Sequence, residues 1–195
     1  MHAKPEPGRQ PLDVSYLLRI QPKSAYPPAF HDTEYGFPIR DDSALLERLA
    51  LEIGQAGLSW ETILKKKEGY KRAFEGFVLD CVAAVGPDPR QEQRLLADAG
   101  IIRNHLKVHA IIENARRFSL LRDSHGSFAG WLDSHHPLPA EEWRKLFKKT
   151  FLFTDGEIVR SFLLSTGYLP GAHDADCPVL EKITALGPPW FIKPL

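Results

Sequence analysis

The stretch from Leu51 to Trp60 holds the residue types best suited to chemistry in this chain. It places a carboxylate, Glu52, eight positions before a large aromatic ring, Trp60, across a tight Gln-Ala-Gly turn. Ser59 follows the turn and is a suitable N-cap for a helix that begins at Trp60. This spacing can bring an acid and a flat π-face to the mouth of one pocket, where they would grip a flat, positively charged ring. The alternative is an ordinary helix–turn–helix corner with a surface glutamate and a core tryptophan.

A second group of residues has the form of a helix-hairpin-helix. Asp98 to Arg103 joins two segments of helical periodicity, and Gly100 permits the tight turn between them. The backbone N–H groups of the turn, with the start of the next helix, can face a phosphate group. Arg103 and Lys107 add positive charge on the same side. The alternative is a plain corner between two helices with a glycine bend.

The composition limits the classes of function. Twenty-five Lys and Arg residues balance twenty-five Asp and Glu residues, so DNA binding would need a local basic face. Basic clusters occur at residues 65–67, 71–72, 103–107, 116–117 and 145–149, although each also fits a solvated helix face. Cys81 and Cys177 form no disulfide framework, which fits a reducing compartment. No apolar run approaches 18 residues and no signal-peptide pattern opens the sequence, so we expect a cytoplasmic protein without a membrane span.

Helical periodicity dominates the sequence and strand-like alternation is scarce, so we predict an all-α fold. Residues 1–29 are expected to form an irregular arm with a short helix from Val14 to Arg19. Residues 30–186 are expected to form one helical domain, and the apolar tail 187–195 to dock on it.

Two helix starts in this domain carry capping signals. Asp42 or Ser43 is expected to cap the first helix, and Thr154-Asp-Gly-Glu157 is a capping box for a helix that Gly167 ends. Other helices are expected after Ser59, near 71–74, and at 78–85, 90–97, 104–121, 127–134 and 140–147.

Several separated blocks agree in order and spacing with one known family. They are His31 to Pro38 with Asp41-Asp42, Leu51 to Trp60 with Thr62 to Lys67, and Asp98 to Asn104 with Lys107 and Asn114-Ala115. Together these blocks resemble the DNA-3-methyladenine glycosylase I family from about Phe30 to Cys177. The resemblance implies a helix-hairpin-helix glycosylase bundle that holds the DNA backbone through its hairpin. It also implies a monofunctional base-excision enzyme that hydrolyses the N-glycosidic bond of 3-methyladenine with water and forms no covalent lysine intermediate.

This family assigns roles to the residues of the first stretch. Trp60 is our candidate for the ring that stacks on the flipped base, which is worth about 1–3 kcal/mol per base. A base methylated at N3 carries positive charge while attached to the sugar, which adds a cation–π attraction to Trp60. The family's matching glutamate recognises the base, and we carry this catalytic and binding role to Glu52. Whether Glu52 also orients water or stabilises an oxocarbenium-like sugar stays open.

The segment from Phe30 to Gly36 is expected to form the facing wall of the pocket. The family has tyrosine and tryptophan where this chain has Phe30 and Tyr35, so stacking is kept but one polar contact to the base is lost. Asp32 and Glu34 are expected to fix this loop by bonding its backbone N–H groups. Gly57 and Leu58 are expected to contact DNA, with Leu58 filling the gap left by the flipped base; an ordinary core leucine is the alternative.

His31, His173 and Cys177 indicate a metal site. Similar family members close a structural zinc with Cys, His, His and Cys, and these three positions match. The N-terminal cysteine is absent, because no cysteine precedes Cys81. Water, His2 or Asp174 would have to complete the shell, since structural zinc normally takes four ligands; otherwise the metal is lost. No cofactor is expected to take part in the chemistry.

Two other functions stay open. The changes at Phe30 and Tyr35 are compatible with a non-catalytic or altered-specificity binder of alkylated or flipped bases. A zinc hydrolase built on the three metal-type residues would lose activity to chelators. For the leading hypothesis, the expected partner is double-stranded DNA containing alkylated bases, bound by a monomer.

Overall fold

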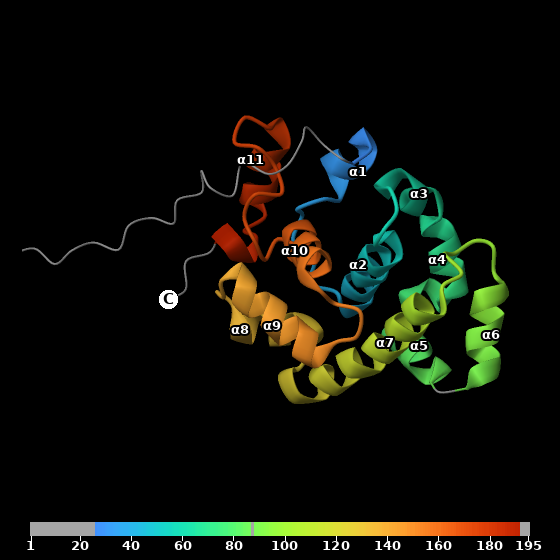
Figure 1. Ribbon diagram of the computed structural model, residues 1–195. Coiled ribbons are helices and arrows are strands. Elements are labelled where there is room, and N and C mark those ends of the chain that lie inside the picture. The colour runs from blue at the N-terminus through green and yellow to red at the C-terminus, as the bar shows by residue number, and fades with distance from the viewer. Residues whose placement is uncertain (1–25, 87, 192–195) are drawn as a thin grey trace, which may run out of the picture.

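The computed structural model describes residues 26–86 and 88–191, and the helix expected at Val14 to Arg19 lies outside these residues. Within the described ranges the chain is helical and has no strand, which confirms the predicted all-α class (Figure 1). The α-helices are α1 Pro28–Thr33, α2 Asp42–Gln55, α3 Trp60–Lys65, α4 Lys67–Ala73, α5 Leu79–Val85, α6 Pro89–Ala97, α7 His105–His125, α8 Phe128–His135, α9 Ala140–Thr150, α10 Gly156–Ser165 and α11 Pro178–Ala185. Two 3-10 turns, η2 Glu75–Phe77 and η3 Pro189–Phe191, complete the described elements.

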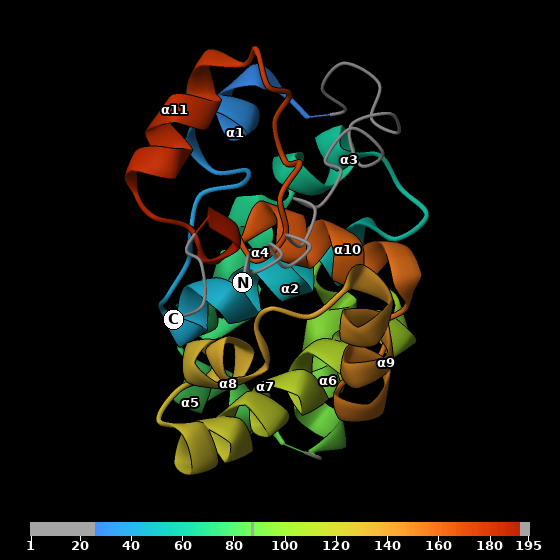
Figure 2. The same cartoon turned by 90° about the vertical axis from the view of Figure 1, so that its left-hand side faces the viewer.

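Helix α2 lies in the middle of the molecule, between α10 and α7 (Figures 1 and 2). Nine of its residues are buried, including Leu45, Leu49 and Ile53, so apolar neighbours enclose the helix on most sides. An element enclosed in this way can hold a polar side chain away from water, and Glu52 is in its last turn.

The cap of α2 differs from the sequence prediction by one residue. Asp41 is the N-cap, and its carboxylate accepts a hydrogen bond from the Ala44 amide at 2.8 Å. The Asp42 carboxylate instead accepts from the amides of Phe128 and Ala129, at 2.9 and 3.3 Å. It thus satisfies donors at the start of α8, which local sequence could not reveal.

The capping box predicted at Thr154 is wrong. Asp155 is the N-cap of α10 and accepts from the Gly156 amide at 2.8 Å. The Thr154 hydroxyl is buried and donates back to the Phe147 carbonyl at 3.0 Å. Gly167 follows the end of α10 at φ +80°, as expected for a left-handed residue after a helix.

The first and last α-helices of the described chain lie side by side (Figures 1 and 2). Helix α1 begins at Pro28, inside the segment predicted to be irregular, because proline is well suited to a first helical turn. Helix α11 was not predicted and lies beside α1 (Figures 1 and 2). The Trp190 amide donates to the Gly167 carbonyl at 3.2 Å, so this part of the tail contacts the body, while Phe191 is 57% exposed.

The helices that the structure describes include none that combines the length and hydropathy needed to cross a membrane.

Candidate active site

A cavity of about 430 Å³ opens where the end of α2, the start of α3 and the first turns of α10 meet. This volume falls within the roughly 300–1,000 Å³ common for small-molecule sites. The residues that line it are Tyr26, Tyr35, Glu52, Gln55, Ala56, Gly57, Trp60, Glu157, Ile158, Arg160 and Ser161. Glu52 and Trp60 therefore line the same cavity, as the spacing of the two residues predicted.

Glu52 is 1% exposed, so the surface glutamate considered as an alternative is wrong. Burial raises the pKa of Glu52 to about 7 from an ordinary value of 4.5, because the charged form loses its water. A hydrogen bond from Ser161 and the charge of Arg48 act against this rise. The Ser165 hydroxyl also donates to Oε1 at 3.4 Å. The site thus holds one carboxyl group that is poised between its two protonation states near neutral pH.

Trp60 starts α3 and is 7% exposed. The Ser59 hydroxyl accepts from the Thr62 amide at 3.2 Å, which confirms the predicted cap and fixes the direction in which Trp60 enters the helix. Phe30 stacks on the Trp60 ring with centroids 5.6 Å apart and planes 24° apart. Phe30 is buried and is not among the residues that line the cavity, so it supports the indole from behind. Tyr35 is also buried and does line the cavity.

Tyr26 is a residue of this site that the sequence did not reveal. Its ring lies 4.1 Å from that of Tyr35 and 5.1 Å from that of Trp60, measured between centroids. Its hydroxyl lies 3.4 Å from the hydroxyl of Ser161. Burial, and then the charge of Glu52, raise the pKa of Tyr26, so the phenol keeps its proton. The one available signal was a tyrosine four residues before Phe30, and the intervening Pro-Pro pair obscured it.

The turn after α2 forms the rim of the cavity. Gly57 has φ +78°, which a side chain would strain, and Leu58 is 37% exposed rather than part of the core. The Gln55 amide group donates to the Leu58 carbonyl at 2.6 Å. Lys107 was predicted to reach DNA, but only 6% of it is exposed, and its ammonium donates to the carbonyls of Gly54 and Ala56 at 2.9 and 2.6 Å. The Lys107 ammonium therefore stabilises the turn that forms the rim of the cavity.

The hairpin between α6 and α7 packs closely on α4. A Cβ atom added to Gly69 would lie 2.2 Å from the Gly100 carbonyl oxygen, so the two backbones touch. The amides predicted to face phosphate are partly engaged within the protein: Gly100 donates to the Asp98 carboxylate at 2.6 Å, and Ile101 to the Asp98 carbonyl at 3.4 Å. The Arg103 side chain is exposed beside this turn.

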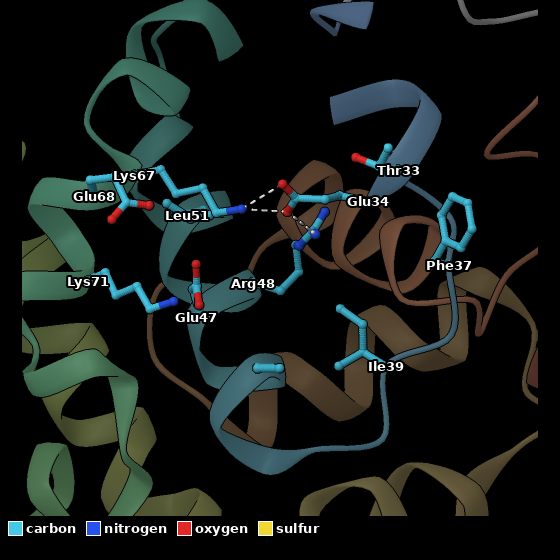
Figure 3. Close-up of a pocket in the computed structure, with 11 residues that line it drawn as sticks. Thr33, Glu34, Phe37, Ile39, Glu47, Arg48, Leu51, Lys67, Glu68 and Lys71 are labelled. Atoms are coloured by element: carbon cyan, nitrogen blue, oxygen red, sulfur yellow. Dashed lines mark hydrogen bonds and ion pairs between the residues drawn. The ribbon is translucent and has the colours of Figure 1, made fainter. Parts of the chain in front are cut away.

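A second cavity, of about 290 Å³, lies between the segment after α1, helix α2 and helix α4 (Figure 3). Glu34 was expected to bond its own loop, but its carboxylate accepts from Lys67 at 2.6 and 2.7 Å and pairs with Arg48 at 3.4 Å. This ion cluster ties the segment after α1 to α2 and α4. Asp32 bonds Nδ1 of its neighbour His31 at 2.7 Å.

His31, His173 and Cys177 come together from the two ends of the described chain. One ligand atom of each lies within 4.8 Å of the others. Nε2 of His173 is 2.7 Å from the Tyr35 carbonyl, which leaves Nδ1 toward the Cys177 sulfur at 3.4 Å. Burial lowers the pKa of His173, which favours the neutral ring that binds metals. Asp174 is outside this cluster, and His2 is outside the described residues.

A helical protein with a glycine-bent hairpin and an aromatic cavity around a buried carboxylate has the features of a helix-hairpin-helix DNA glycosylase. A family model described as methyladenine glycosylase matches residues 21–150. The chain belongs to this methyladenine glycosylase family and is thus a base-excision enzyme by class.

The chain is similar to several characterised proteins. It is 41% identical to DNA-3-methyladenine glycosylase 1 of Escherichia coli K12 over 56% of this chain and 59% of that enzyme. It is 30% identical to the DNA-3-methyladenine glycosylase of Haemophilus influenzae over 76% of this chain and 89% of that one. A glutamate-to-glutamine variant of 3-methyladenine DNA glycosylase I from Staphylococcus aureus shares the fold at a TM-score of 0.70 with 33% identity, covering 77% of this chain and 90% of that one.

Proposed function

We propose that the chain hydrolyses the N-glycosidic bond of 3-methyladenine in alkylated double-stranded DNA. The observation that carries this proposal is the buried carboxyl of Glu52 in an aromatic cavity that the Trp60 ring also lines. A relative from Staphylococcus aureus, 33% identical and with a TM-score of 0.66, is described as recognising 3-methyladenine, which agrees with the proposal.

The pocket favours a cationic base for an electrostatic reason. An ionised carboxylate is costly to bury without a partner. A base methylated at N3 brings a positive charge that offsets this cost, holds Glu52 in its ionised form and attracts the π-face of Trp60. Normal adenine is neutral and adds no charge to offset the burial of the carboxylate. Selection thus follows from the charge of the lesion.

Once the base is flipped out of the duplex, hydrolysis of the bond needs few catalytic groups from the protein. Water attacks C1′ of the sugar, the C1′–N9 bond breaks, and its electron pair stays on the base, which leaves as neutral 3-methyladenine. The attacking water gives one proton to solvent. The leaving base needs no proton, and no lysine lines the cavity in the described part of the chain, in keeping with direct hydrolysis.

The rim turn and the hairpin supply the proposed DNA contacts. Leu58 is exposed beside the cavity and can fill the space that the flipped base leaves. Lys107 links this rim to the first turn of α7, so the rim and the hairpin are held together. Arg103 can then neutralise a phosphate, a contact that positions the duplex and reads no sequence.

The test is release of free 3-methyladenine from methylated duplex DNA by the wild type, Glu52→Gln and Glu61→Gln. Glu61 is a matched control, because it lies on α3 next to Trp60 but is exposed and pairs with Lys65 alone. We expect release by the wild type and by Glu61→Gln, and at least a tenfold slower release by Glu52→Gln. Equal rates for the wild type and Glu52→Gln would contradict the role of the buried acid.

Phe30 favours one second function, a binder without turnover, because it lacks the hydroxyl that the family has at this position. Tyr26 supports the enzyme instead, since it brings another phenol to the same cavity. Tight binding of an abasic-site analogue, with no release of any methylated base, would identify the binder.

We also propose that His31, His173 and Cys177 hold a structural zinc ion. The second ring nitrogen of each histidine is already oriented, by Asp32 and by the Tyr35 carbonyl, as is usual for zinc ligands. The fourth ligand would be water or a residue outside the described ranges. The ion would tie α1 to the segment before α11 and take no part in the chemistry. Metal analysis should find about one zinc per chain in the wild type and none in a His173→Ala, Cys177→Ala variant; a zinc-free wild type would refute this.

A further inference from the structure

Arg48 is a buried charge that the proposed chemistry leaves unused. It lies on α2 one helical turn before Glu52 and is 5% exposed. Its guanidinium carbon is 4.7 Å from the centroid of the Phe30 ring, and Nη2 is 3.4 Å from the Glu34 carboxylate. Figure 3 shows Arg48 pointing to Glu34 along the second cavity, whereas it is not among the residues lining the base cavity.

The ion pair with Glu34 does not explain why an arginine is buried here. Both Glu34 oxygens already accept short hydrogen bonds from Lys67, and Nη1 of Arg48 is buried with no hydrogen-bond partner. A buried arginine with an incomplete set of partners is generally no more stabilising than a hydrophobic side chain of similar size. The guanidinium also lies over the Phe30 ring, and Glu52 occupies the (i, i+4) position on the same helix.

We propose that Arg48 is a positioning residue of the base pocket. It supports Phe30 by a cation–π contact, which in turn supports the Trp60 ring, and its positive charge favours the ionised form of Glu52. The proposal rests on the function assigned above to the pocket. It adds a residue outside the lining of the base cavity, one helical turn before Glu52 on α2, that controls both the stacking wall and the charge of the acid.

The other titratable groups around the base cavity do not supply the positive charge that Arg48 brings to Glu52. Tyr26 and Tyr35 are phenols, and Glu157 and Arg160 of α10 line the same cavity with opposite charges. Lys107 of α7 is held by the carbonyls of Gly54 and Ala56. The charge of Arg48 opposes the effect of burial on the pKa of Glu52, which is still about 7. Without Arg48 this pKa would rise further, and less of the enzyme would carry the carboxylate at neutral pH.

The experiment compares the wild type with Arg48→Met, Arg48→Lys and the control Lys71→Met. Lys71 lines the second cavity with Arg48 but has an exposed side chain. The readouts are the pH dependence of kcat/KM for 3-methyladenine release and the ¹³C NMR titration of the Glu52 carboxyl carbon, assigned by its absence in Glu52→Gln.

For Arg48→Met, we expect the acid limb of the kcat/KM profile and the NMR midpoint of the Glu52 carboxyl to move to higher pH. A move of one pH unit would reduce the ionised fraction at pH 7 about fivefold. Arg48→Lys keeps the charge and loses the planar contact with Phe30, so its midpoint should stay near that of the wild type while its KM rises. Lys71→Met should leave both readouts unchanged. The proposal is overturned if the NMR midpoint of Glu52 is unchanged in Arg48→Met or moves in Arg48→Lys, even if the wild type releases no base. If the midpoints are as expected but the wild type releases no base, only the proposed function is contradicted.

Discussion

Replacing Glu52 by glutamine removes the charge from the pocket and keeps the size of the side chain. In the folded protein the pKa of Glu52 is about 7, whereas the ordinary value of 4.5 applies to the unfolded chain. Between these two values the folded protein holds one proton more than the unfolded chain, so the free energy of unfolding falls as pH rises. The full decrease in the free energy of unfolding is about 3 kcal/mol, at roughly 1.36 kcal/mol per unit of pKa. About 2.5 kcal/mol of it develops between pH 5 and pH 8.

Glu52→Gln should therefore gain stability relative to the wild type as pH rises from 5 to 8. For a chain of this length, the gain corresponds to roughly 5–10 °C in the difference between the two melting temperatures. Thermal denaturation of both proteins at pH 5 and pH 8 measures it, and Glu61→Gln is the control because its exposed carboxyl should change stability little. A wild-type-to-variant difference that is the same at both pH values would show that Glu52 is not buried as an acid, and would remove the electrostatic basis of the selection for cationic bases.

Three further predictions concern the stacking wall, the hairpin and the rim. Trp60→Leu should weaken the binding of free 3-methyladenine, measured by calorimetry, by roughly 5- to 150-fold, because about 1–3 kcal/mol of stacking is lost; a change under twofold would exclude Trp60 as the stacking ring. Gly69→Ala places a Cβ atom 2.2 Å from a hairpin carbonyl oxygen and should lower the free energy of unfolding in urea by about 1–3 kcal/mol, whereas Gly156→Ala, whose new Cβ meets nothing closer than 3.9 Å, should not. Arg103→Ala should reduce the slope of log K for DNA binding against log salt by about 1. Lys107→Met should weaken excision without changing this slope, because the Lys107 ammonium is engaged by the carbonyls of Gly54 and Ala56. Equal changes in slope for the two variants would contradict this division of roles.

The local order of the chain was predictable from sequence because its signals are local. Ser59 caps α3 as expected, since the cap needs only the amide of a residue three positions later. The start of α7 follows the same rule, with the Asn104 side chain accepting from the Lys107 amide at 3.2 Å. Where a capping side chain had a more distant partner, as with Asp42 at the start of α8, the prediction failed by one residue.

The spacing of Glu52 and Trp60 indicated a shared pocket, but sequence alone left a surface glutamate as an alternative. Tertiary structure decided the matter, because the hydroxyls and helices that bury Glu52 come from α10, more than one hundred residues later in the chain. Desolvation depends on everything that packs around a group, and no local pattern reports it. The inward direction of the Lys107 side chain has the same origin, since its partners Gly54 and Ala56 are 53 and 51 residues away in the sequence.

By itself, the sequence determined the helical class, the order of the elements and the residue types available for a cationic base. Only the folded chain decided which of them share a cavity, that Tyr26 joins it, and that Arg48 lies between Phe30 and Glu34. The physical reason is that periodicity and capping act over one or two helical turns, whereas burial and charge pairing are set by segments that meet only after folding.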